Sequence, residues 1–121
     1  MYKISKQFSF SAAHSLWGLS EDHPCTRLHG HNYVVTVHLK AEELNETGFV
    51  KDYNELKIVK QYIDEHIDHR NLNDIMHPLN SSAENIAKML FNIFKPMIPE
   101  LFAVEVSETP KTSAIYEPEG K

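Results

Sequence analysis

Apolar and polar residues alternate along two segments of the chain, residues 2–14 and residues 29–41. A period of two is that of a β-strand, and β-branched residues in the second segment favour the same structure. Residues 15–28 hold Gly18, Pro24 and several polar groups, which indicates a long loop between the strands. The shared faces consist of Tyr2, Ile4, Phe8, Phe10, Ala12 and His14, interrupted by Lys6, and of His29, His31, Tyr33, Val35, Val37 and Leu39.

Two later segments have the spacing of amphipathic helices. The first is predicted over about residues 53–67, and the second ends at Pro96. A pair typical of a capping box precedes each helix, Asp52 with Glu55 and Ser81 with Glu84. The apolar positions at helical spacing are Leu56, Val59, Ile63 and Ile67 in the first helix, and Ile86, Met89, Leu90, Ile93 and Phe94 in the second.

The last segments return to strand alternation, over residues 101–108 and 112–117, with a turn at Pro110 and Lys111. The order β-β-α-α-β-β predicts an α+β fold in which two helices cover one face of an antiparallel sheet. We interpret residues 1–121 as a single domain. The second sheet face is expected to carry further apolar side chains and histidines, and such a face predicts a homo-oligomer.

Composition excludes several classes of protein. The chain has 121 residues and a formal charge of −5, from 12 Lys and Arg against 17 Asp and Glu, which argues against a nucleic-acid-binding domain. The longest apolar run is the four residues 101–104, too short for a membrane-spanning helix or the apolar core of a signal peptide. One cysteine gives no internal disulfide and suits a reducing compartment, so we expect a cytoplasmic protein.

The strongest chemical signal is His29-Gly30-His31 in the second predicted strand. Residues two apart point the same way, with Cα atoms roughly 6.6 Å apart, so both imidazoles can reach one ion. His14 ends the neighbouring strand and completes a set of three. Three neutral histidines and one open position are typical of a catalytic zinc site. Two alternatives stay open: His23 as the third ligand, and a separate pair formed by His66 and His69.

Four other residues are candidates for proton transfer or binding. Cys25 lies in a polar loop beside Arg27, where a thiol close to a cation could act as base or nucleophile. Asp68 precedes His69 and could hold its imidazole in one tautomer. Glu108 ends a strand on an apolar face, where a carboxylate needs a donor such as a pair of N–H groups. Each also has a simpler interpretation. Cys25 could be an inert small apolar residue, Asp68 and His69 could form a solvated helix end, and Glu108 could reach solvent at the end of its strand.

Six motifs follow one another along the chain: Phe10-Ser11-Ala12-Ala13-His14, Cys25-Thr26-Arg27-Leu28-His29-Gly30-His31, Gly48-Phe49-Val50-Lys51-Asp52-Tyr53, Asp68-His69-Arg70-Asn71-Leu72-Asn73, Ser82-Ala83-Glu84-Asn85-Ile86-Ala87 and Glu105-Val106-Ser107-Glu108-Thr109. Taken together, they resemble the 6-pyruvoyl-tetrahydropterin synthase family. The resemblance implies that family's tunnelling fold, in which subunits join their sheets into a barrel, commonly as a hexamer of two stacked trimers. Three residues separate Cys25 from His29, a spacing similar to the 6-carboxytetrahydropterin synthase branch.

The resemblance also implies a reaction. The substrate would be 7,8-dihydroneopterin triphosphate, and the products 6-carboxy-5,6,7,8-tetrahydropterin, acetaldehyde and triphosphate, a step of queuosine biosynthesis. One alternative is the pyruvoyl product of the same family, and another is a zinc-binding module without catalysis. The implied zinc ligands are His14, His29 and His31, and the implied proton-transfer groups are Cys25, Asp68 and His69. Glu108 would bind the N–H and amino groups of the pterin, and Ser82 would contact its ring. Arg27 and Arg70 would bind the triphosphate.

Overall fold

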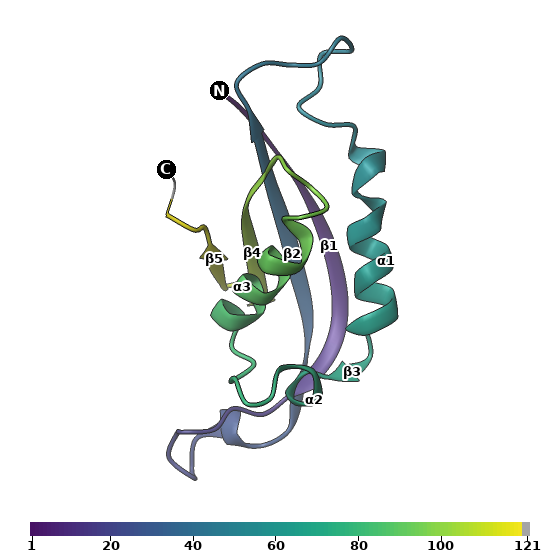
Figure 1. The fold of residues 1–121 in the computed structure, drawn as a ribbon. Helices are drawn as coiled ribbons and strands as arrows, with labels where there is room; N and C mark the ends of the chain where they lie inside the picture. The colour runs from purple at the N-terminus through teal and green to yellow at the C-terminus, as the bar shows by residue number, and fades with distance from the viewer. Residues whose placement is uncertain (120–121) are drawn as a thin grey trace.

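The computed structural model describes residues 1–119, so the last two residues of the predicted domain lie outside it. A five-stranded sheet has the strand order β3-β1-β2-β4-β5, and the helices lie along one of its faces (Figure 1). Along the chain the elements are β1 (Tyr2–His14), η1 (Pro24–Thr26), β2 (His29–Ala41), η2 (Tyr53–Leu56), α1 (Lys57–His66), β3 (Arg70–Asn71), α2 (Leu72–Met76), α3 (Ala83–Phe94), β4 (Leu101–Thr109) and β5 (Thr112–Tyr116).

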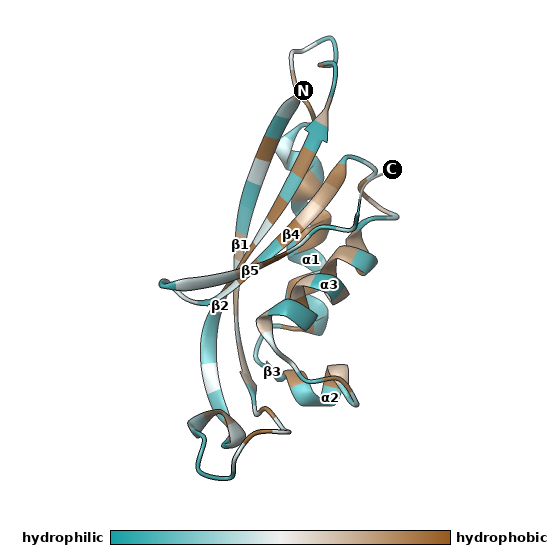
Figure 2. Cartoon of the chain, turned by 90° about the vertical axis from the view of Figure 1, so that its left-hand side faces the viewer, coloured by the Kyte–Doolittle hydropathy of each residue, from teal (hydrophilic) through white to brown (hydrophobic). Residues whose placement is uncertain are grey.

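The long hairpin of β1 and β2 organises the sheet. The two strands pair antiparallel along their full length, from Tyr2 opposite Ala41 to His14 opposite His29. The alternation along both strands is visible in Figure 2. The predicted strand limits are confirmed for both strands, and the pairing brings the ends that carry the histidines together.

The buried face of the sheet packs against α1 and α3, which lie on the same side in Figure 2. Val59 and Ile63 of α1 and Leu90 and Phe94 of α3 are almost fully inaccessible to solvent, as is Tyr33 of β2. Burial of such side chains contributes roughly 1.5–3 kcal/mol each. The predicted α+β fold with its helices on one face is therefore confirmed.

The opposite face of the sheet is mostly polar, which differs from the apolar second face that the sequence predicts, although His38, Phe102 and Ile115 lie on it. Ser5, Gln7 and Ser9 are exposed and alternate with the buried Phe8 and Phe10. A groove of about 520 Å³ on this face is lined by Ser5, Gln7, Val34, Thr36, His38, Glu105, Ser107, Pro110, Lys111, Thr112 and Ser113. The apolar side chains on this face, such as Val34 and Ile115, are therefore interspersed with polar ones.

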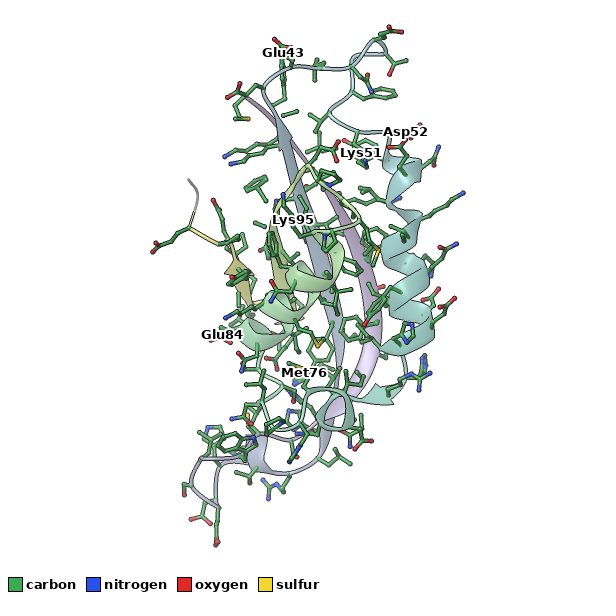
Figure 3. The ribbon with its side chains drawn as sticks, viewed as in Figure 1. Glu43, Lys51, Asp52, Met76, Glu84 and Lys95 are labelled. Carbon is green, nitrogen blue, oxygen red and sulfur yellow. The ribbon has the colours of Figure 1, made fainter. Side chains whose placement is uncertain are left out.

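The starts of the two predicted helices differ from the expected capping boxes. The first helix begins with the 3-10 turn η2, and the carboxylate of Asp52 accepts from the backbone N–H of Asn54 at 2.9 Å. Asp52 is labelled at the start of this segment in Figure 3. The N-cap of α3 is Ser82, whose hydroxyl accepts from the N–H of Asn85 at 3.2 Å. The cap therefore lies one residue later than predicted, which leaves Ser81 free for another contact.

Two short elements have no counterpart in the predicted order. β3 pairs in parallel with the end of β1, with Arg70 opposite Ala12, and α2 follows it directly. Neither is long enough to show a periodic pattern, because β3 has two residues and α2 has five. No helix in residues 1–119 is long and apolar enough to cross a membrane.

Candidate metal centre

Three histidines meet at the end of the β1–β2 hairpin, as the sequence predicts. His14 is the direct partner of His29, and His31 lies opposite Ala12, two residues along. One ligand nitrogen from each ring lies within 4.8 Å of the others. The ring centroids of His14 are 4.6 Å from His29 and 5.2 Å from His31. His23, the alternative third ligand, is not part of this group in residues 1–119.

Backbone carbonyls orient two of the three rings. Nδ1 of His14 lies 2.8 Å from the carbonyl oxygen of Ser81 and 3.0 Å from its hydroxyl. Nδ1 of His29 lies 2.7 Å from the carbonyl oxygen of Arg27. A carbonyl can only accept, so both Nδ1 atoms carry the proton and both Nε2 atoms keep a free lone pair. This arrangement is common around metal-binding histidines.

The most buried ring is His14, which is fully inaccessible to solvent. Burial lowers the pKa of His14 below its ordinary value, against the opposing effects of the Ser81 carbonyl and of Glu108, so the neutral ring is favoured. Its Nε2 is a buried polar atom without a hydrogen-bond partner in the described residues. Three histidine rings that come together, one of them with a buried unpaired Nε2, fit a divalent cation such as zinc.

Glu108, which the sequence analysis assigns to binding of the pterin, lies beside this group; its contact with the histidines was not predicted. Its Oε2 is 3.1 Å from Nε2 of His31 and 3.6 Å from Nε2 of His14. Tyr33, also close by, stacks on Phe10 at 4.8 Å between ring centroids. Burial and, after it, the charge of Glu108 raise the pKa of Tyr33. The hydroxyl of Tyr33 is a second buried polar atom without a partner in residues 1–119.

Cys25 lies in η1, in the connection that joins β1 to β2, and its side chain is half-buried. Its backbone N–H donates to Nδ1 of His23 at 3.1 Å. Its carbonyl oxygen accepts from the N–H of Leu16 at 2.7 Å, two residues after His14. The backbone of Cys25 is therefore connected to the end of β1.

Asp68 and His69 contact each other at the edge of β1, with Oδ2 and Nδ1 3.0 Å apart. The N–H of Ser11 donates to the other carboxylate oxygen at 2.9 Å, and this bond, followed by His69, holds the pKa of Asp68 below its usual range. His69 has a left-handed backbone, with φ of 61°, and its side chain is 80% exposed. No hydrogen bond or ion pair joins Asp68 or His69 to the three metal-site histidines within residues 1–119.

His69 also lines an open groove of about 540 Å³ together with Arg70 and Leu28. Ser11, Ala13, Gly30 and Asn32, from the sheet face opposite the helices, complete much of its lining. His66, the alternative partner of His69, instead packs its ring 4.6 Å from that of Tyr62. His31 of the histidine group lines the same groove, so His69 and one of the three rings face a common space.

Of the remaining predicted residues, Arg27 is exposed, and Ser82 uses its hydroxyl to cap α3. The guanidinium of Arg70 donates to the carbonyl of Glu65 at 2.8 Å. The role of Ser81 as a partner of His14 was missed. A serine before a helix is ordinarily a cap, and no local pattern shows that it faces a strand 67 residues away.

Comparison with known proteins identifies the family. The family model described as 6-pyruvoyl tetrahydropterin synthase matches residues 3–119. The structure of the Caenorhabditis elegans 6-pyruvoyl tetrahydropterin synthase superposes with a TM-score of 0.85, at 31% identity, covering 98% of this chain and 96% of that one. The chain belongs to the 6-pyruvoyl tetrahydropterin synthase family.

Curated relatives refine this assignment. A 6-carboxy-5,6,7,8-tetrahydropterin synthase from Synechocystis sp. is 36% identical, over 96% of this chain and 93% of its own length. A protein of the same name from Haemophilus influenzae is 33% identical, over 97% of this chain and 99% of its own. The prediction of an enzyme similar to this branch is confirmed by these relatives.

Proposed function

We propose that this enzyme converts 7,8-dihydroneopterin triphosphate and water to 6-carboxy-5,6,7,8-tetrahydropterin, acetaldehyde and triphosphate, with zinc held by His14, His29 and His31. The observation that carries the proposal is that the ligand nitrogens of these three rings lie close together and that Nε2 of the buried His14 has no hydrogen-bond partner in the described residues. The cation supplies a Lewis acid that makes carbinol protons of the substrate side chain more acidic. The names of the curated relatives support this choice of product.

The chain's own groups then bind the substrate and move protons. Cys25 acts as the general base at the substrate side chain, and its hydrogen bond to Leu16, two residues after His14, supports a place near the histidines. Glu108 accepts the ring N–H and amino hydrogens of the pterin, which orients the side chain toward the histidines. Asp68 holds Nδ1 of His69, so that Nε2 of the same ring is the atom that exchanges a proton.

The position of the Asp68–His69 pair supports a homo-oligomer, in agreement with the predicted hexamer of two trimers. His69 lines the groove on the sheet face away from the helices together with His31, and its side chain is largely exposed. We infer that a second copy of the chain covers this groove and that the pair serves a site shared between copies. The triphosphate would bind Arg27 and Arg70, and Ser82 would lie beside the pterin ring.

Turnover of 7,8-dihydroneopterin triphosphate by the zinc-loaded protein tests the proposal, with acetaldehyde and the absorbance of the pterin as readouts. Acetaldehyde in equal amount to consumed substrate is expected. Cys25→Ala should abolish turnover while zinc stays bound, whereas His38→Ala, whose ring pairs with Glu105 on the opposite sheet face, should retain it. Turnover by Cys25→Ala at the parent rate would remove the base assignment.

The pyruvoyl product is the second candidate, because the structurally similar Caenorhabditis elegans protein bears that name. In that reaction triphosphate leaves without cleavage of a carbon–carbon bond. Consumption of substrate without acetaldehyde would select it. Zinc binding without consumption of substrate would instead select the non-catalytic zinc-binding module.

A further inference from the structure

Two asparagine side chains hold the start of the loop that follows His14. Oδ1 of Asn73 accepts from the N–H of Ser15, and its Nδ2 donates to the carbonyl of Ser15, both at 2.8 Å. Oδ1 of Asn80 accepts from the N–H of Trp17, and its Nδ2 donates to the carbonyl of Trp17, both at 2.9 Å. A carboxamide offers the same donor and acceptor as a peptide group. The two side chains therefore pair with alternate residues, as a neighbouring strand would.

The residue between these two contacts binds the loop of Cys25. Alternate residues of an extended chain direct their backbone groups to opposite sides. The backbone N–H and carbonyl groups of Ser15 and Trp17 are hydrogen-bonded to the two asparagines, whereas the N–H of Leu16 donates to the carbonyl oxygen of Cys25 at 2.7 Å. The position of Cys25 relative to His14 thus depends on the backbone that Asn73 and Asn80 hold.

The asparagines are themselves fixed by their surroundings. The backbone N–H of Asn73 donates to the side chain of Asn71 at 2.9 Å, at the start of α2. The carbonyl of Asn80 accepts from the side chain of Asn85 in α3 at 3.0 Å. The next residue, Ser81, is the partner of His14. One short segment of chain therefore holds both the buried metal-site histidine and the cysteine loop.

We propose that Asn73 and Asn80 are positioning residues that set the place of Cys25 relative to the histidine site. The proposal rests on the proposed function, since it concerns the residue proposed there as the base. Neither asparagine needs to touch the substrate. Loss of either carboxamide makes the backbone of residues 15–17 more mobile. Because Leu16 is hydrogen-bonded to Cys25, the thiol of Cys25 then shifts relative to the histidine site. A displacement of about 1 Å is enough to slow a reaction roughly a hundredfold.

Asn45 provides a matched control. Its side chain also accepts backbone N–H groups, from Thr47 at 3.0 Å and Phe49 at 2.9 Å. It lies in the connection between β2 and η2, at the opposite end of the molecule from the loop after β1 (Figure 1). Asn45→Ala therefore removes the same kind of contact without reaching the site.

The experiment compares Asn73→Ala, Asn80→Ala and Asn45→Ala in the zinc-loaded protein. Four quantities are measured: zinc content, amide exchange of Leu16, the pH profile of alkylation of Cys25 by iodoacetamide, and kcat with KM. For the two site variants we expect unchanged zinc, faster exchange at Leu16, a displaced alkylation profile, and a kcat lower by about 10- to 100-fold at constant KM. Asn45→Ala should match the parent in all four.

Asn73→Asp keeps the acceptor for Ser15 but loses the donor, so its kcat and alkylation profile should lie between those of the parent and Asn73→Ala. It also serves if the alanine variant does not fold. Parental kcat and alkylation profiles in both site variants would overturn the proposal, and so would an equal loss of kcat in Asn45→Ala. A parent without turnover would instead refute the proposed function, and the exchange and alkylation data would then decide this inference alone.

Discussion

The carbonyl oxygen of Ser81 lies 2.8 Å from Nδ1 of His14, which joins the start of α3 to the end of β1. This contact fixes the proton on Nδ1 and leaves Nε2 of a fully buried ring directed toward His29 and His31. Its neighbour Ser82 performs a different task, because its hydroxyl caps α3. Of these two adjacent serines, Ser81 therefore orients the buried His14 ring, and Ser82 stabilises the helix.

The two serines should respond differently to substitution. Ser81→Ala removes the hydroxyl contact and keeps the carbonyl, so zinc affinity should fall by up to about tenfold. Ser82→Ala removes the cap and should lower the free energy of unfolding by about 1 kcal/mol with zinc affinity unchanged. Zinc titration against a competing chelator and urea denaturation measure the two effects. Equal zinc affinity in the parent and both variants would show that the hydroxyl of Ser81 does not orient His14.

Tyr33→Phe should leave the folded protein as stable as the parent or more stable. The hydroxyl is buried without a partner in residues 1–119, and an unsatisfied buried group costs about 1–3 kcal/mol. Tyr33→Leu is the contrast, because it also removes the ring stacked on Phe10 and should destabilise. Urea denaturation measures both variants. A loss of about 1 kcal/mol in Tyr33→Phe would mean that the hydroxyl makes a hydrogen bond in the folded protein.

Stability should depend on the charge of Asp68 in a defined direction. The N–H of Ser11 and then His69 lower the pKa of Asp68, so its stabilising effect is present above the unfolded pKa of about 3.9 and is lost as the pH falls through the lower folded value. Asp68→Asn should therefore be less stable than the parent at pH 6, and the difference should shrink toward pH 3. Urea denaturation at both pH values tests this, and a constant difference would contradict it.

Glu108→Gln should weaken binding of a dihydropterin by about 10- to 100-fold, because a hydrogen bond to a charged group contributes about 1.5–3 kcal/mol. Zinc should stay bound, since the three histidines remain. Glu105→Gln is the matched control: Glu105 lies on the same strand but pairs with His38, on the opposite sheet face. Fluorescence titration measures affinity. Equal weakening in both variants would show that the effect does not come from the site.

Much of this fold could be predicted because its long elements each have a clear period. The alternation of apolar and polar residues was enough to predict the strands over residues 2–14 and 29–41. Their antiparallel pairing then places His14 beside His29. β3 could not be predicted, since two residues carry no period and its pairing with β1 is a tertiary contact.

The grouping of His14, His29 and His31 was predicted from the sequence, but the residues that surround them were not. The carbonyl of Ser81 and the carboxamides of Asn73 and Asn80 reach residues 58 to 67 positions away in sequence, which no local pattern reveals. The polar character of the open sheet face was likewise mispredicted. Ser5, Gln7 and Ser9 stand between the apolar residues of β1, so the exposed side chains of the strand are polar.

Metal analysis tests the central claim most directly. The purified protein should hold one zinc per chain, His29→Ala should lose it during dialysis against a weak chelator, and His38→Ala, on the opposite sheet face, should keep it. Because His29 is only half-buried, its loss should leave the fold intact, as circular dichroism would show. Equal zinc content in the parent and a folded His29→Ala would contradict the three-histidine site and the reaction built on it.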